Sequence, residues 1–146
     1  MTTPPSDSEN AFIDIIEWND PLVAASGFPI SDIYVELFWL PILGPTATWL
    51  IRRCAHGLTE QPQGYTVDMA DLAQRIGVAY SSGRHNPFAR ALHRCIMFGA
   101  AQQIALHPRR TLAVRTTLPA LPQRHLARLP EQLQIAHHDW VGHLVR

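Results

Sequence analysis

Arginine side chains offer the clearest candidate chemistry in this sequence. From Leu72 to Pro130 the chain has nine Arg and no Asp or Glu, and a surface of one sign favours a ligand of the opposite sign. Arg forms paired hydrogen bonds with phosphate groups and with the edge of guanine. The chain has no Lys anywhere. Codon bias in a GC-rich genome would also produce that preference, so composition leaves both explanations open.

The polar side chains of this region fall into two candidate roles. Arg90, His93 and Arg94 share one face of a predicted helix, which makes them candidates for contacts with DNA base edges. Hydroxyl, amide and guanidinium groups nearby are candidates for phosphate contacts. The predicted phosphate-binding residues are Ser82, Arg84, Asn86, Arg109, Arg110 and Arg115. The alternative is an ordinary solvated face, although such faces mix charges of both signs. Four or five phosphate contacts would give a slope of about −4 for log affinity against log salt.

Local signals predict the elements that position these residues. Pro45 begins a helix that Gly57 ends, and Asp68 caps a second helix that ends at Gly77. Asn86 caps a third helix over residues 87–98, whose apolar positions recur at helical spacing. Short strands are predicted at residues 65–67, 102–106 and 111–117, the last two joined as a hairpin.

The two ends of the chain differ from this central part. Residues 1–36 carry seven acidic residues and no Arg. We predict a disordered tail at residues 1–8 and an acidic extension with a first helix at residues 9–44. The apolar stretch 12–18 fits either a helical turn or an edge strand. The acidic arm is a candidate for contact with the Arg surface or with another protein.

A C-terminal helical extension is predicted for residues 118–146. Two apolar helix faces are candidates for a homodimer interface, one carrying Phe38 and Trp39 and the other carrying Trp140 and Leu144. Packing within a single chain explains both faces equally well.

The order helix, strand, helix, helix, hairpin resembles a winged helix-turn-helix domain over residues 45–117. Four strings also resemble a family of small, mostly uncharacterised actinobacterial proteins: YVELFWLP at 34–41, LGPT at 43–46, GRHNPFARAL at 83–92 and LP at 129–130. The resemblance covers about residues 32–140. It implies a winged-helix fold and a bacterial source, and it implies no activity. The expected fold class is mainly α with a small β-hairpin, a winged helix-turn-helix with N- and C-terminal helical extensions.

Other chemistry finds less support in the sequence. Cys54 with His56 and His93 with Cys95 supply zinc-type ligands, but residues two apart on a helix face different sides, so we expect no metal or other cofactor. Residues Ser81, Ser82 and His85 have no acidic residue nearby in the sequence, so we expect no enzyme. The apolar stretch 33–51 is interrupted by proline and glycine, and the N-terminus has no apolar signal segment. We therefore expect a cytoplasmic protein without a membrane segment.

These observations favour a sequence-specific protein that binds double-stranded DNA and acts as a small bacterial transcription regulator. The alternative is a winged-helix interaction module whose Arg-rich face binds an acidic protein partner. A more distant third is an anion-binding enzyme or ligand sensor. Binding of duplex DNA after deletion of residues 1–31 would separate the first two hypotheses.

Overall fold

The computed structural model describes residues 11–81 and 86–144, so the predicted tail at 1–8 lies outside the described residues. Its elements in chain order are β1 (Phe12–Glu17), α2 (Pro21–Ser26), β2 (Phe28–Pro29), the π-helix η1 (Val35–Trp39), α3 (Leu40–Leu43), α4 (Pro45–Glu60), β3 (Tyr65–Asp68), α5 (Met69–Arg75), α6 (Pro87–Met97), β4 (Ala101–Ala105), β5 (Arg110–Val114), β6 (Thr117–Leu118), α7 (Gln123–Leu126) and α8 (Glu131–Leu144). Within the described ranges, every helix is too short or too polar to cross a lipid bilayer.

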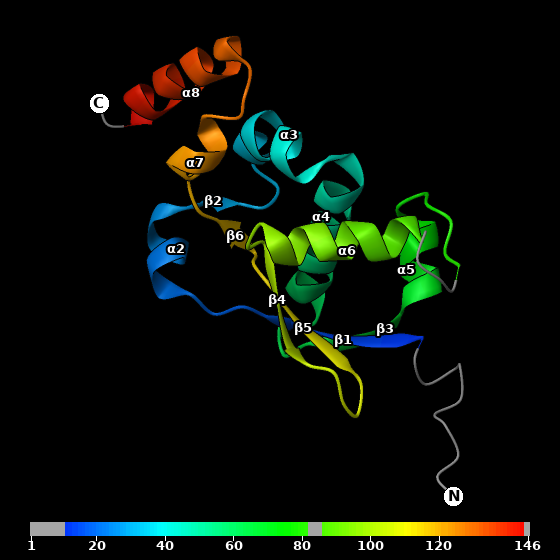
Figure 1. Cartoon of the computed structure of the whole chain (residues 1–146). Coiled ribbons are helices and arrows are strands. Elements are labelled where there is room, and N and C mark those ends of the chain that lie inside the picture. Colours follow the sequence, from blue (N-terminus) through cyan, green and yellow to red (C-terminus); the bar gives the residue numbers. More distant parts are fainter. Residues whose placement is uncertain (1–10, 82–85, 145–146) are drawn as a thin grey trace, which may run out of the picture.

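Four strands form a mixed sheet in the order β3-β1-β5-β4 (Figure 1). β1 runs antiparallel to β3 and parallel to β5, while β4 and β5 form an antiparallel hairpin. β2 and β6 form a second, two-stranded sheet. Of the described residues, 53% are helical and 19% lie in strands. The predicted fold class, a mainly α winged helix-turn-helix with a small hairpin, is therefore wrong. The chain has an α/β fold, and the hairpin forms one edge of a larger sheet.

The position of β1 accounts for this difference. Ile13 and Ile15 point to the same side of the strand and are buried in the core. Strand β1 hydrogen-bonds to β3 along one edge and to β5 along the other, so residues 12–17 form an inner strand instead of a helical turn or an edge strand. The predicted extension 9–44 and the predicted domain 45–117 consequently share one sheet and one hydrophobic core.

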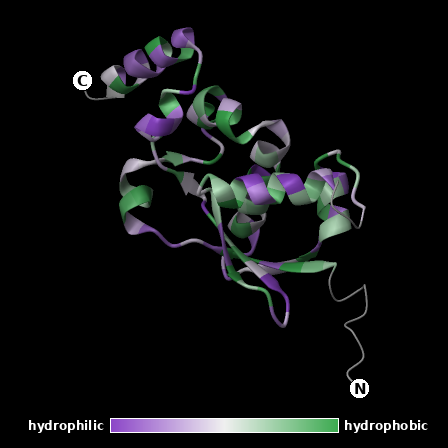
Figure 2. Ribbon diagram, viewed as in Figure 1, coloured by the Kyte–Doolittle hydropathy of each residue, from purple (hydrophilic) through white to green (hydrophobic). Residues whose placement is uncertain are grey.

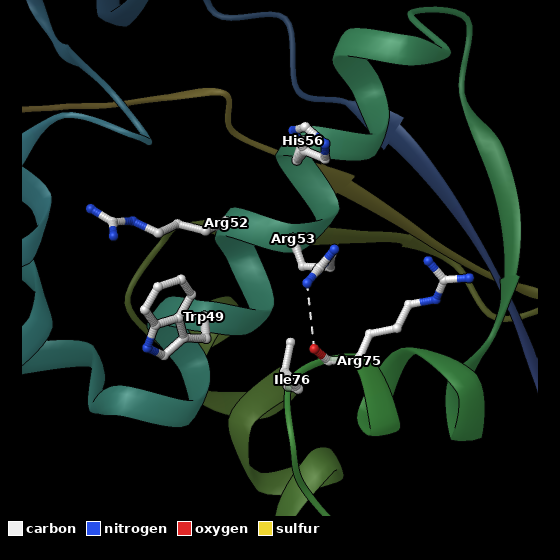
Figure 3. Close-up of a pocket in the computed structure, with 6 residues that line it drawn as sticks. All are labelled: Trp49, Arg52, Arg53, His56, Arg75 and Ile76. Carbon is white, nitrogen blue, oxygen red and sulfur yellow. Dashed lines mark hydrogen bonds between the residues drawn. The ribbon is translucent and has the colours of Figure 1, made fainter.

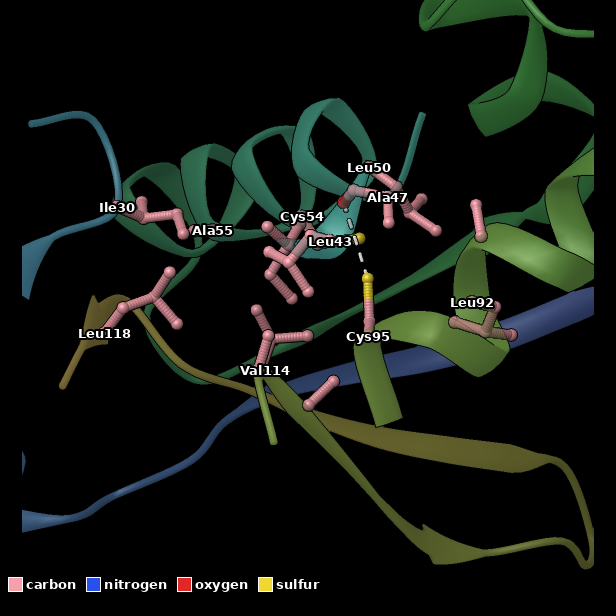
Figure 4. Close-up of a cluster of buried hydrophobic side chains, with 14 of the residues drawn as sticks. Ile30, Leu43, Ala47, Leu50, Cys54, Ala55, Leu92, Cys95, Val114 and Leu118 are labelled. Carbon is pink, nitrogen blue, oxygen red and sulfur yellow. Dashed lines mark hydrogen bonds between the residues drawn. The ribbon is translucent and has the colours of Figure 1, made fainter. Parts of the chain in front are cut away.

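The core lies where helices α4 and α6 pack against the sheet (Figure 4). Both cysteines are buried free thiols, and the Cys95 thiol donates a hydrogen bond to the Ala47 carbonyl at 3.4 Å. Burial raises the pKa of the Cys54 thiol to about 12 and also raises the pKa of Cys95. Because the thiol form is favoured at neutral pH, these side chains act as small apolar groups of the core.

Individual elements between residues 45 and 114 follow their local signals closely. α4 begins at Pro45, and the Asp68 side chain caps α5 by accepting a hydrogen bond from the Ala70 N–H at 2.8 Å. Two predicted boundaries are wrong: α4 continues past Gly57 to Glu60, and the strand predicted at 111–117 ends at Val114, since Thr117 belongs to β6 of the second sheet. A Cβ at position 57 would lie 2.5 Å from the Tyr65 ring. Gly57 therefore permits close approach of a neighbouring side chain and does not end the helix.

The aromatic side chains of the first helical segment are packed against other parts of the same chain. Phe38 and Trp39 lie on η1 and are each 1% exposed. The Trp39 indole N–H donates to the Pro119 carbonyl at 2.9 Å, and the Trp140 ring lies edge-on to Phe38 at 6.1 Å. The predicted homodimer surface through Phe38 and Trp39 is therefore wrong, since those side chains are covered by the same chain.

A buried polar contact joins α8 to this segment. The Tyr34 hydroxyl oxygen accepts the backbone N–H of Leu121 at 2.8 Å, which leaves its own proton available for Nε2 of His137 at 2.7 Å. His137 is buried, and burial lowers its pKa, with a smaller contribution from neighbouring His138. The imidazole is therefore neutral in the folded chain at neutral pH, and its Nε2 accepts a hydrogen bond donated by the Tyr34 hydroxyl.

The His137 contact predicts a specific loss of stability in acid. In the unfolded chain His137 regains its ordinary pKa of about 6.5, so the unfolded state binds more protons than the folded state below that pH. The free energy of unfolding should be fully retained above pH 6.5 and should fall as the pH drops through 6.5 toward the lower folded pKa. Urea unfolding of the wild type and His137→Gln at pH 7.5 and pH 5.5 measures this difference.

The exposed neighbour His138 provides the matched control, because His138→Gln removes an imidazole that is not buried. We expect His138→Gln to keep most of the pH dependence of the wild type, because burial is the larger cause of the lowered pKa of His137, and His137→Gln to reduce it more strongly. An identical pH dependence in the wild type and His137→Gln would contradict the buried neutral imidazole.

Candidate nucleic-acid interface

Helix α6 carries the predicted base-reading residues and is fixed in place at its N-terminus. The Asn86 side chain accepts a hydrogen bond from the Phe88 N–H at 3.0 Å, and Pro87 occupies the first turn. Asn86 is itself buried. Its side-chain oxygen therefore caps the helix, and this predicted phosphate contact has a structural role.

The two faces of α6 have opposite character. One face buries Phe88, Ala91, Leu92 and Cys95 against the core. The residues exposed on the other face are Ala89, Arg90, His93, Arg94 and Met97. In Figure 2 hydrophilic positions of α6 face the viewer, and further hydrophilic positions occur at the end of the β4–β5 hairpin. The exposed face of α6 contains no acidic residue.

Arg94 differs from its neighbours on this face because its guanidinium group is already bound. Nε donates to the Leu43 carbonyl at 2.7 Å, and a terminal nitrogen donates to the Ile42 carbonyl at 2.5 Å. These carbonyls lie at the C-terminal end of α3, where a cation is favourable. The group also lies 5.2 Å from the centre of the Phe98 ring. Arg94 therefore joins α6 to α3, which leaves Arg90 and His93 as the exposed cation and imidazole of α6.

The hairpin contributes two of the predicted phosphate-binding residues. Arg109 lies in the β4–β5 loop and forms an ion pair with Asp14 of β1 at 3.3 Å; its side chain is 46% exposed. Arg110 begins β5 and is half-buried. Among the described residues, no carboxylate forms an ion pair with Arg110, Arg90 or His93.

Arg115 is held inside the fold. Its guanidinium group donates to the Gly99 carbonyl at 2.8 Å and to Asp20 at 3.0 Å, and it stacks 3.7 Å from the centre of the Trp18 ring. The side chain is only 12% exposed. The hydrogen bond from Arg115 lowers the pKa of the Asp20 carboxyl group, which stays ionised at neutral pH. Arg115 is therefore unavailable for the phosphate contact that the sequence suggested.

The structure thus brings only part of the predicted site together. Ser82 and Arg84 lie outside the described residues. Arg90 and His93 share the exposed face of α6, while Arg109 and Arg110 lie at the hairpin. Asn86, Arg94 and Arg115 stabilise the fold instead.

The sequence indicated contact between the acidic arm and the Arg surface, but it did not identify the carboxylates that neutralise part of the Arg-rich region. Asp14 and Asp20 come from the acidic N-terminal segment and pair with Arg109 and Arg115. The sequence shows an excess of acidic residues at 1–36 and of Arg in the rest of the chain. No local pattern specifies which of these side chains form ion pairs.

The described part of the chain offers little support for a metal site or a catalytic site. No group of three or more His, Cys, Asp or Glu side chains comes close enough there to hold a metal ion. Of the predicted serine and histidine cluster, only Ser81 is described, and it is exposed.

Comparisons of the chain with protein-family models, with curated proteins and with solved structures find no match.

Proposed function

We propose that this protein binds double-stranded DNA in a sequence-specific way through Arg90 and His93 of α6 and the hairpin residues Arg109 and Arg110, and that it acts as a small transcription regulator. The observation that carries the proposal is the exposed, acid-free face of α6. That face displays Arg90 and His93 on a helix whose opposite face is buried in the core.

The geometry of α6 supports contact with base edges. The helix has 11 residues, which suits insertion into the major groove of DNA. Arg90 and His93 are three residues apart and therefore lie side by side on the surface. The guanidinium group can donate two hydrogen bonds to guanine, and the buried stripe and the Asn86 cap fix the helix that carries it.

The hairpin supports contact with the phosphate backbone. The Arg109–Asp14 ion pair lies at the surface and is partly exposed, and ion pairs in contact with solvent contribute only about 0–1 kcal/mol. A phosphate group can therefore compete with Asp14 for Arg109. With Arg109 and Arg110 as the phosphate-binding cations, log affinity should fall against log salt with a slope of about −2. This slope is shallower than the sequence suggested because Arg115 is already bound within the fold.

Replacing Arg90 by Ala should weaken binding to the preferred duplex by about 1–3 kcal/mol and relax specificity at one position, because a base contact is lost. Replacing Arg110 by Ala should weaken all duplexes alike, because phosphate contacts carry no sequence information. Selection from a random duplex library with the full chain gives the preferred sequence. Gel retardation at several salt concentrations then measures both variants.

Arg53→Ala is the matched control, because Arg53 is an exposed cation on the side of α4 that faces away from α6. We expect its duplex affinity to equal that of the wild type. An equal loss on every duplex for Arg90→Ala would refute base reading by Arg90. Failure of the wild-type chain to retard any duplex at low salt would refute the proposed function.

A specific observation also favours a second candidate, a protein-interaction module that binds an acidic partner. Asp14 pairs with Arg109 at the hairpin, which supports binding of a carboxylate by this surface. The variant Asp14→Asn separates the two candidates without removing strand β1. If DNA is the ligand, freeing Arg109 from Asp14 should tighten duplex binding at low salt. If neither chain binds duplex, the acidic partner remains.

A further inference from the structure

A second surface lies on the side of α4 that faces away from α6. Trp49, Arg52, Arg53 and His56 recur at helical spacing on this side, and we call them the α4 surface (Figure 3). The opposite side of α4 is buried, and there Ala47 accepts the hydrogen bond from α6. Trp49 is 56% exposed. An exposed Trp among Arg side chains is unusual for a solvated helix and typical of a protein interface.

A cationic hollow of about 480 Å³ lies between the α4 surface and the end of α5. Besides the α4 surface it is lined by Arg75 and Ile76, so its lining contains three Arg and no carboxylate (Figure 3). Arg53 donates to the Arg75 carbonyl at 3.4 Å. The Arg75 side chain pairs with Asp71 at 3.0 Å, but both groups are more than half exposed. This pair is weak enough for an incoming carboxylate to compete.

An apolar hollow of about 430 Å³ lies on the other side of Trp49 and Arg52. Its lining includes Pro29, Ile30 and Ala55. The two hollows share Trp49, Arg52 and His56. The α4 surface is therefore a ridge with an apolar depression along one side and a cationic depression along the other.

The ridge is held in a fixed conformation before any partner binds. Nε of Arg52 donates to the Ile30 carbonyl at 3.0 Å, and a terminal nitrogen donates to the Asp32 carbonyl at 3.2 Å. Glu36 lies 3.7 Å from the same guanidinium group, which in turn lies 5.6 Å from the centre of the Trp49 ring. A surface that is already ordered loses less conformational entropy on binding.

We propose that the α4 surface docks a segment of a partner protein in which a large apolar side chain is followed closely by one or more carboxylates. The apolar side chain fills the depression beside Ile30 and Ala55. The carboxylate enters the depression beside Arg53 and Arg75. Trp49 packs between them and is the residue on which affinity depends most. This proposal uses residues separate from those of the proposed DNA contact, so each can fail without the other.

Charge and shape favour a peptide over the other occupants. Two copies of the chain related by a two-fold axis would bring the Arg-rich lining of the cationic depression close to the same lining of the second copy. A nucleic acid strand could stack a base on Trp49, but the depression beside Ile30 is lined mainly by apolar surface and suits an apolar side chain better than a phosphate group. A peptide with both apolar and acidic side chains matches both depressions.

Selection of random 16-residue peptides displayed on phage, with the full chain as bait, tests the proposal. We expect enriched peptides to combine Asp or Glu with Leu, Ile, Phe or Trp. For a synthetic peptide of the enriched sequence, Trp49→Ala and Arg53→Glu should each weaken binding on the order of tenfold or more. Fluorescence anisotropy measures the affinity, and thermal unfolding checks that both variants remain folded.

Two exposed residues elsewhere provide matched controls. Ile104→Ala removes an exposed apolar side chain from the hairpin, and Arg90→Ala removes an exposed cation from α6; neither should change peptide affinity. Peptides that bind Trp49→Ala as tightly as the wild type would overturn the proposal, as would an enriched sequence without acidic residues or a selection that yields no binder. Binding of a (dT)8 oligonucleotide that depends on Trp49 and displaces the peptide would instead assign this surface to single-stranded nucleic acid.

Discussion

Phe38→Ala should lower the free energy of unfolding by about 3–5 kcal/mol, the range for a buried aromatic side chain replaced by Ala. Phe38 is 1% exposed and packs against Tyr34, His137 and Trp140. The substitution leaves a cavity at the point where η1 meets α8. Urea unfolding measures the loss. Leu37→Ala is the matched control, because its side chain is exposed on the same helix and its removal should change stability far less.

The same substitution separates a core role from an interface role for Phe38. If the side chain belongs to the core of one chain, Phe38→Ala destabilises the protein at every protein concentration. If it instead lay between two chains, the variant would change the molar mass measured by light scattering while each chain kept its stability. The second result would contradict the packing of Phe38 against Trp140.

Ile15→Ala should lower the free energy of unfolding by about 2–5 kcal/mol. Ile15 is 0% exposed and lies on β1 beside Leu112 of β5. The loss should be near the upper end of this range, because β1 is bonded on both edges and the cavity cannot be filled by moving an outer strand. Urea unfolding again measures the change. Ile16→Ala, on the opposite face of the strand and only half-buried, should cost less.

The inner position of β1 has a wider consequence for experiments on this protein. A chain that lacks residues 1–31 loses the strand that joins β3 to β5 and exposes both of their edges. Such a deletion is therefore unsuitable for testing the acidic arm, although the sequence suggested it. If the shortened chain unfolded cooperatively with the stability of the full chain, β1 could not be an inner strand.

The acidic N-terminal segment has a structural role that its composition did not specify. Its carboxylates fitted a solvated tail, a docking arm for another protein, or contact with the Arg surface of the same chain. Asp14 and Asp20 pair with Arg109 and Arg115 of the same chain, as the third alternative expected. The separation of charge along the sequence is partly cancelled in space, and the proposed DNA surface is correspondingly smaller.

Sequence alone determined the features that depend on residues a few positions apart. Asp68 and Asn86 cap helices because a side-chain oxygen reaches an N–H two residues away. The two faces of α6, and with them the exposure of Arg90 and His93, follow from helical spacing. These interactions form within one turn of helix and need no distant partner, so local reasoning found them.

Tertiary structure alone decided the features that join distant segments. Asp20 meets Arg115 across 95 positions and Tyr34 meets His137 across 103, and β1 joins strands that begin more than 50 residues later. An alternating apolar pattern marks a strand but does not name its neighbours. The neighbours of a strand are decided by the arrangement that buries the most apolar surface while pairing every backbone group. That choice is a property of the whole chain, which is why the inner strand and the bound Arg side chains could not be read from the sequence.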